Sequence, residues 1–139
     1  MRALPNLIRL HRWKLDERRR AVADLEALRM AIWEDIEQLE VEMGRESSAS
    51  RELTKGVALF PSYFANARAR RMRLEASVDE IEISLDAARE EAAKAYREVR
   101  KYETVLENHE RQEELSEKRQ QQAEQDEIAL GIFRRSASS

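Results

Sequence analysis

The stretch FPSYFANARARRMRLEASVDEIEISLDAAREEAAKAYREVRKYETVLENH, residues 60–109, decides the fold of this chain. Alternating steps of four and three through it reach fifteen positions, and thirteen of them are apolar. A repeat averaging about 3.5 residues keeps one narrow apolar stripe against a partner helix, so it predicts one strand of a coiled coil. The fifteen positions are Phe60, Phe64, Ala67, Arg71, Leu74, Val78, Ile81, Leu85, Ala88, Ala92, Ala95, Val99, Tyr102, Leu106 and His109.

A second stripe with the same spacing runs through the first third of the chain, where nine of twelve positions are apolar. The chain is 38% charged and contains only three glycines and two prolines, a composition typical of long helices rather than of a many-element globule. We therefore expect an all-α fold, an elongated antiparallel two-helix coiled coil whose longer second helix overhangs at its C-terminus. The predicted seam consists of Leu15, Val22, Leu25, Ile32, Ile36, Leu39, Leu74, Val78, Ile81, Leu85, Val99, Tyr102 and Leu106.

The helix boundaries follow from the few helix-breaking residues. Gly44 comes directly after the first stripe and precedes a serine-rich segment, whereas Pro61 suits the first turn of a helix. These signals predict a first helix over about 3–43, a turn over 44–60, a second helix over 61–130 and a flexible tail over 131–139. We expect residues 1–139 to form a single coiled-coil domain.

Basic and acidic stretches alternate along the chain, and their order is an independent test of the antiparallel pairing predicted for the two helices. Residues 1–20 carry seven Lys or Arg against two acids, whereas residues 76–130 carry eight against sixteen. A fold-back near residue 51 pairs positions whose numbers sum to about 103, and opposite charges then meet along the overlap. Exposed ion pairs of this kind contribute only a few tenths of a kcal/mol each, so they select register more than they stabilise.

This register leaves about residues 104–135 of the second helix uncovered, and an apolar cluster lies near the end of that overhang. Exposed apolar residues on a single helix favour a partner, with fraying of an ordinary C-terminus as the alternative. Aromatic residues near the turn favour either a binding tip or a hydrophobic cap, and Trp13 either packs on the flank or contacts a partner. The candidate partner-binding residues are Trp13, Phe60, Tyr63, Phe64, Leu74, Ile128, Leu130, Ile132 and Phe133.

The residues give no support for catalysis, and we expect no enzyme, no cofactor, no metal site and no small-molecule substrate. The chain has no cysteine, no glycine-rich phosphate loop and no spaced metal ligands. In the predicted register His11 falls near Ala92, far from His109, so the two histidines form no pair. The basic clusters have acidic counterparts in the chain and the net charge is -3, so we expect no nucleic-acid binding. No stretch is long and apolar enough to suggest a membrane span.

Four local motifs stand out: the basic Arg18–Arg20 cluster before a heptad stripe, the turn Lys55–Ala58, the aromatic helix start Ser62–Phe64 and the tail Gln122–Ala129. Together they resemble the FliJ family of flagellar type III export proteins. The resemblance spans nearly the whole chain.

The resemblance implies a cytoplasmic stalk that is peripherally associated with the inner-membrane export apparatus. It implies that the stalk inserts into the export ATPase hexamer, links it to the membrane export gate and handles export chaperones. The open end, with Trp13 and the overhang through Phe133, would then engage the ATPase. Tyr63, Phe64 and Leu74 would contact the gate.

Two other classes of protein remain open at this point. One is the equivalent stalk of a virulence-type secretion system, which a neighbouring flagellar gene set would distinguish. The other is a generic structural or adaptor coiled coil. A stalk is expected to be a monomer when isolated, whereas a structural coil is expected to self-associate.

Overall fold

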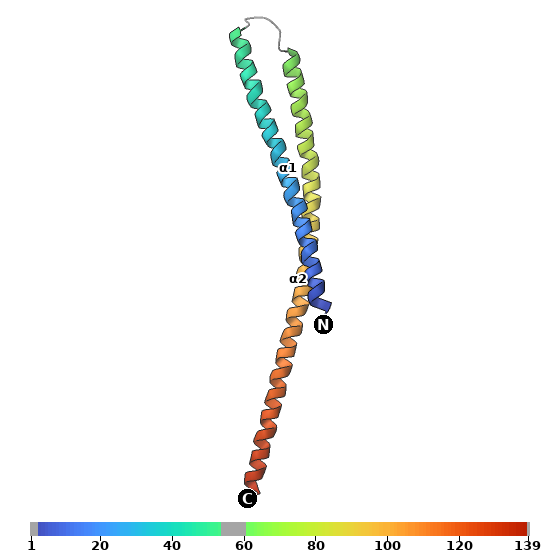
Figure 1. Ribbon diagram of the computed structural model, residues 1–139, viewed down its shortest axis with the longest axis vertical. Coiled ribbons are helices and arrows are strands. Elements are labelled where there is room, and N and C mark those ends of the chain that lie inside the picture. Colours follow the sequence, from blue (N-terminus) through green and yellow to red (C-terminus); the bar gives the residue numbers. More distant parts are fainter. Residues whose placement is uncertain (1–2, 54–60, 139) are drawn as a thin grey trace. The chain divides into compact units, whose positions relative to one another are not determined.

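The computed structural model describes residues 3–53 and 61–138. Two helices account for almost all of them: α1, Ala3–Leu53, with 51 residues, and α2, Pro61–Ala137, with 77 residues. Figure 1 shows both helices, and no strand occurs in the described ranges. The chain is thus an all-α helical hairpin with a longer second helix, which confirms the predicted fold class.

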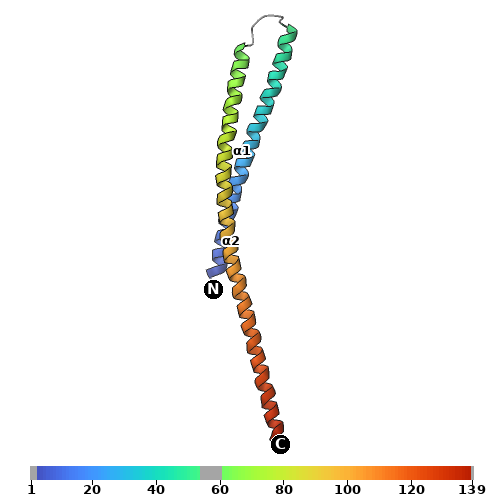
Figure 2. The same ribbon diagram turned by 180° about the vertical axis from the view of Figure 1, so that it is seen from behind.

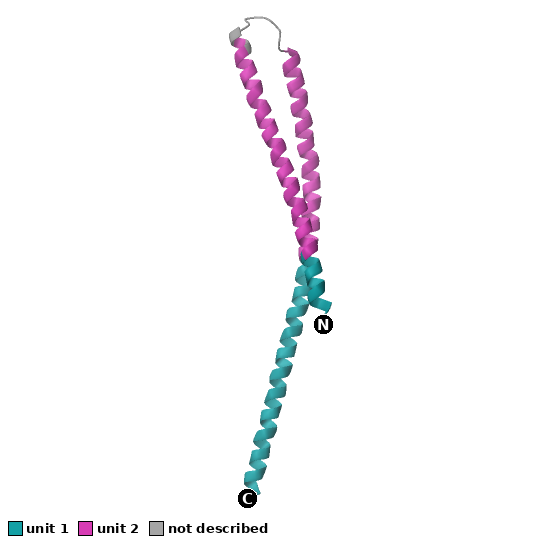
Figure 3. Ribbon diagram, in the orientation of Figure 1, with its two compact units in different colours: residues 1–12, 97–139 teal, residues 13–96 magenta. Residues whose placement is uncertain are grey.

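Contacts divide the chain into two compact units, coloured separately in Figure 3. Unit 2 is Trp13–Tyr96, in which α1 and α2 lie side by side when seen from the front and from behind (Figures 1 and 2). Unit 1 is Met1–Arg12 together with Arg97–Ser139. In each unit the described parts of the two helices pair in antiparallel fashion. The single coiled-coil domain over residues 1–139 stays a prediction.

The predicted end of the first helix, near residue 43, is wrong because α1 continues to Leu53. A glycine ends a helix when it takes a left-handed backbone conformation, but Gly44 lies within helical backbone and nothing approaches the place of a Cβ there. Met43, Ser47 and Ala49 are half-buried, so packing holds the serine-rich segment in the helix. The rest of the predicted turn, residues 54–60, lies outside the described residues.

The prediction of a flexible tail over residues 131–139 is wrong for residues 131–137, because α2 remains helical to Ala137. The hydroxyl of Ser138 donates to the carbonyl of Arg135 at 3.2 Å, and the backbone N–H of Ser138 donates to the carbonyl of Arg134, also at 3.2 Å. Both bonds occupy carbonyls that the last helical turn leaves without intrahelical partners. The helix therefore extends through the apolar cluster that was expected near its end.

The predicted register is also wrong. Three ion pairs join α1 to α2 within unit 2, and the residue numbers of each pair sum to between 111 and 115, not to about 103. The ten extra residues of α1 move the fold-back toward the C-terminus, and every facing pair shifts with it. Opposite charges still meet, but with other partners: Arg29 with Glu82, Glu40 with Arg71 and Glu26 with Arg89.

The seam carries the burial in both units. Every described position of the α2 stripe, from Phe64 to His109, is buried or half-buried, and so is every residue of the predicted seam on α1. Leu85 is fully buried, with 0% of its surface exposed. The other buried apolar residues are Leu4, Ile8, Leu15, Leu39, Ala67, Ile81 and Val99.

Candidate partner-binding surfaces

The start of α1 packs against α2 within unit 1. Leu4 and Ile8 are buried there, and the His11 ring stacks on Tyr102 with centroids 4.8 Å apart. The Lys101 ammonium lies 5.1 Å from the centroid of the same Tyr102 ring. The predicted proximity of His11 to Ala92 is therefore wrong, for the same change of register. Two half-buried polar rings fill one layer of the seam instead.

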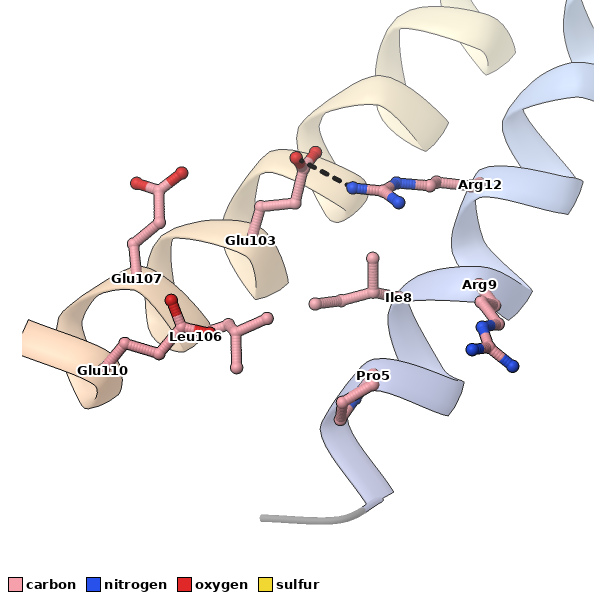
Figure 4. Close-up of a pocket in the computed structure, with 8 residues that line it drawn as sticks. All are labelled: Pro5, Ile8, Arg9, Arg12, Glu103, Leu106, Glu107 and Glu110. Carbon is pink, nitrogen blue, oxygen red and sulfur yellow. Dashed lines mark hydrogen bonds and ion pairs between the residues drawn. The ribbon is translucent and has the colours of Figure 1, made fainter. Parts of the chain in front are cut away.

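A shallow pocket lies beside this layer, between the start of α1 and the facing part of α2 (Figure 4). Arg12 spans it and pairs with Glu103 at 3.3 Å, and Arg100 approaches the same carboxylate at 3.7 Å. Its volume is about 370 Å³, and its lining carries charges of both signs, from two arginines and three glutamates. The pocket thus fits a register-setting role better than the capture of a charged ligand. Its other lining residues are Pro5, Ile8, Arg9, Leu106, Glu107 and Glu110.

The C-terminal segment of α2, residues 110–137, continues beyond the part of unit 1 that α1 covers. Figure 3 shows it as a single helix running on past the N-terminus. Every residue from Glu110 to Leu130 is exposed. Isolated helices in water gain no packing from a neighbour, so exposed apolar residues on one indicate a surface that a partner covers. Five large apolar residues of this segment are each more than half exposed: Leu115, Ile128, Leu130, Ile132 and Phe133.

The other candidate residues lie in unit 2. Trp13 is 60% exposed, whereas Tyr63, Phe64 and Leu74 are half-buried. The rings of Tyr63 and Phe64 meet edge to face, with centroids 5.3 Å apart. Phe60 lies outside the described residues. The structure therefore brings Tyr63 and Phe64 together, as one aromatic pair at the start of α2, and leaves Trp13 most available to a partner.

Arginines occupy two half-buried positions of the heptad stripes, and each pairs with a glutamate of the other helix. Arg71 bonds Glu40 of α1 at 2.6 Å and Glu75 of its own helix at 3.0 Å. Arg29 bonds Glu82 at 2.8 Å, and its guanidinium carbon lies 4.7 Å from the centroid of the Trp33 ring. One face of the Trp33 ring is therefore in contact with the Arg29 guanidinium.

The described residues contain no group of three or more His, Cys, Asp or Glu side chains arranged to hold a metal ion. His109 pairs with Glu113 one turn along the same helix at 2.8 Å. His11 contacts an aromatic ring, as described above, so the geometry of neither histidine indicates a nucleophile or a metal.

No family model, no curated protein and no solved structure matches this chain. Neither described helix includes a stretch apolar enough, over the length required, to cross a membrane.

Proposed function

We propose that this chain is the cytoplasmic stalk of a bacterial flagellar type III export apparatus, inserting into the export ATPase hexamer and linking it to the export gate. The observation that carries the proposal is the C-terminal segment, residues 110–137, a helix that α1 leaves uncovered. A single helix with its side chains is about 10–12 Å across, which suits entry into the narrow centre of a ring.

The sequence motifs support the same proposal. The basic cluster Arg18–Arg20, the aromatic start of α2 and the tail Gln122–Ala129 are the features that resemble FliJ proteins. The tail lies wholly within the C-terminal segment, so the residues with the strongest resemblance are also the ones available to a partner. The ATPase contact is accordingly assigned to this segment, with Trp13 as a second contact.

The gate contact is assigned to the start of α2. Tyr63, Phe64 and Leu74 are only half-buried, so part of each remains available to another protein. On this proposal the stalk handles export chaperones and stays peripheral to the inner membrane through the gate. Aromatic residues are enriched among the residues that dominate protein interfaces, which favours Tyr63 and Phe64 over their charged neighbours.

The test compares the intact chain with a chain that ends at Glu110. Each is mixed with the purified flagellar export ATPase of the same genome, and cosedimentation, the fraction of ATPase hexamer and the rate of ATP hydrolysis are measured. We expect the intact chain to bind and to promote hexamer formation, and the shortened chain to do neither. Ile83→Ser, which alters an exposed residue of unit 2, is the control and is expected to bind like the intact chain.

Thermal unfolding followed by circular dichroism shows whether the shortened chain keeps the helix pairing. Normal ATPase binding by that folded, shortened chain would refute the assignment of the site to the C-terminal segment. Failure of the intact chain to bind the ATPase would refute the proposed function itself.

A further inference from the structure

Charges on the C-terminal part of α2 are separated between two sides of the helix. Residues 107–127 contain seven glutamates, and at about 100° per residue all seven fall within roughly 160° of arc. We call this side the glutamate face; it consists of Glu107, Glu110, Glu113, Glu114, Glu117, Glu124 and Glu127. The three cations of the same stretch, Arg111, Lys118 and Arg119, all lie outside that arc.

The opposite side combines positive charge with apolar surface. We call it the basic face and define it by Arg111, Leu115, Arg119, Gln122, Leu130 and Phe133, all of them exposed. Its one acid is Asp126, whose carboxylate accepts a hydrogen bond from the Gln122 amide at 3.2 Å. The basic face therefore presents Arg119 beside large apolar side chains, whereas Arg111 has Glu107 four residues before it and Glu114 three residues after it.

Arg119 lies at the centre of the basic face. Residues three and four positions away are its neighbours on the helix surface, and these are Leu115, Ser116, Gln122 and Ala123. None of them is acidic, so the helix itself supplies Arg119 with no counter-charge at those spacings. An acidic group on a partner would supply it.

Large apolar residues lie near both ends of the basic face, Leu115 at one end and Leu130 and Phe133 at the other. Leu115 and Phe133 are separated by 18 residues, five full turns, so they point in the same direction about 27 Å apart. Leu130 lies on the same side, one turn before Phe133. An amphipathic helix laid along α2 contacts such residues in turn, as helices do in groove-type recognition.

The glutamate face does not suit an anionic partner. Glu110, Glu113, Glu114 and Glu117 are spaced three or four residues apart and repel one another. Seven glutamates and one aspartate against three cations also give residues 107–127 a net negative charge, which disfavours an anionic lipid surface. A second copy paired in parallel through the basic face would bring Arg119 against Arg119. An amphipathic helix of another protein whose carboxylates face Arg119 contacts the basic face alone, so its acids lie on the side of α2 away from the glutamates.

We infer that the basic face of α2 docks an acidic amphipathic helix of the ATPase ring, with the glutamate face turned away from that helix. Apolar residues of the partner contact Leu115, Leu130 and Phe133, and its carboxylates pair with Arg111 and Arg119. This inference rests on the proposed function, because the ATPase is the partner assigned to the segment. It adds which face is used and what chemistry the partner presents.

Two matched double variants of the full-length chain test the face. Leu115→Ser with Phe133→Ser removes two exposed apolar residues from the basic face, and Ile128→Ser with Ile132→Ser removes two from the other side. We expect the first variant to weaken binding to the purified ATPase by about tenfold or more, and the second, whose residues lie outside the basic face, to weaken it several-fold less. Circular dichroism verifies that both keep the helicity of the unaltered chain.

Charge variants test the partner's chemistry. Arg119→Glu is expected to weaken binding more than Arg119→Ala does, while Glu117→Gln on the glutamate face leaves it unchanged. The inference would be overturned if Arg119→Glu bound the ATPase as tightly as the unaltered chain does. It would also be overturned if Ile128→Ser with Ile132→Ser weakened binding more than the basic-face pair does. Either outcome would leave the proposed function standing. Failure of the unaltered chain to bind the ATPase would overturn both.

The absence of cysteine from this chain allows a direct identification of the docked element. A benzophenone label on a single introduced cysteine, Gln112→Cys, lies on the side of the basic face, and the control label at Gln121→Cys lies on the glutamate side. We expect the first label to cross-link the ATPase within an acidic helix and the second to cross-link it far less. Cross-linking mainly from the second label, or of the chain to itself, would contradict the inference.

Discussion

Arg29 and Glu82 are joined across the two helices of unit 2 by an ion pair 2.8 Å long, at a position where the heptad repeat otherwise places an apolar residue. The Arg29 side chain is only 20% exposed, and its guanidinium also lies over Trp33. Its Nε atom is buried without a hydrogen-bond partner in the described part of the chain. The pair therefore contributes to the register of α1 against α2, because it places a carboxylate beside a guanidinium that is mostly buried.

Removal of Glu82 should destabilise unit 2. Glu82→Ala leaves the Arg29 guanidinium half-buried without its carboxylate, so we expect a loss of about 1–2 kcal/mol in the free energy of unfolding. Urea unfolding followed by circular dichroism measures the change. Glu80→Ala, two residues away at an exposed position, is the control and should change stability by less than about 0.5 kcal/mol. Equal effects of the two substitutions would show that the pair does not contribute.

Replacement of Arg29 itself should leave the free energy of unfolding unchanged or raise it. Arg29→Leu restores an apolar residue to the seam and leaves Glu82, which is 39% exposed, in contact with water. Exchange of a largely buried charge for an apolar residue of similar size is often neutral or stabilising, by about 1–4 kcal/mol. We therefore expect an unchanged or higher urea midpoint. A large loss of stability would mean that the contacts of Arg29 with Trp33 and Glu82 outweigh its desolvation.

Leu85 and Ile83 give the sharpest contrast between buried and exposed positions of α2. Leu85 is 0% exposed and Ile83 is 72% exposed, although only one residue separates them. We expect Leu85→Ala to cost about 2–4 kcal/mol in the free energy of unfolding, because it removes buried methyl groups and leaves a cavity in the seam. Ile83→Ala should cost less than about 0.5 kcal/mol. A comparable cost for both would contradict the position of the seam.

The fold class and the seam could be predicted from sequence because burial in a two-helix hairpin follows a strict period. Phe64, Leu74, Leu85 and Val99 are placed by counting alone, and counting needs no knowledge of the turn. The register could not be predicted in the same way, since it depends on where α1 ends. Gly44 and the following serines are typical of a helix end, yet packing of Met43 and Ser47 keeps them helical.

The charge separation on α2 depends on the same fact about helix length. Glu113 and Arg119 lie on different sides because the helix runs without a break from one to the other. A tail that frayed after residue 130 would carry Phe133 in no fixed direction relative to Leu115. The unbroken helix turns a polar, low-complexity stretch into a surface with two distinct faces, which is the basis for assigning a partner to one of them.

Gly44 provides a test of why α1 continues. It lies within helical backbone, and a Cβ added there would meet no atom within 4 Å. Gly44→Ala should therefore stabilise the chain by about 0.5–1 kcal/mol, because alanine loses less backbone entropy than glycine in a helix. Urea unfolding measures the gain, and Ala31→Gly, at an exposed interior position of the same helix, should show a loss of similar size. If Gly44 instead ended the helix in a left-handed conformation, alanine at this position would destabilise the chain, so the sign of the change distinguishes the two structures.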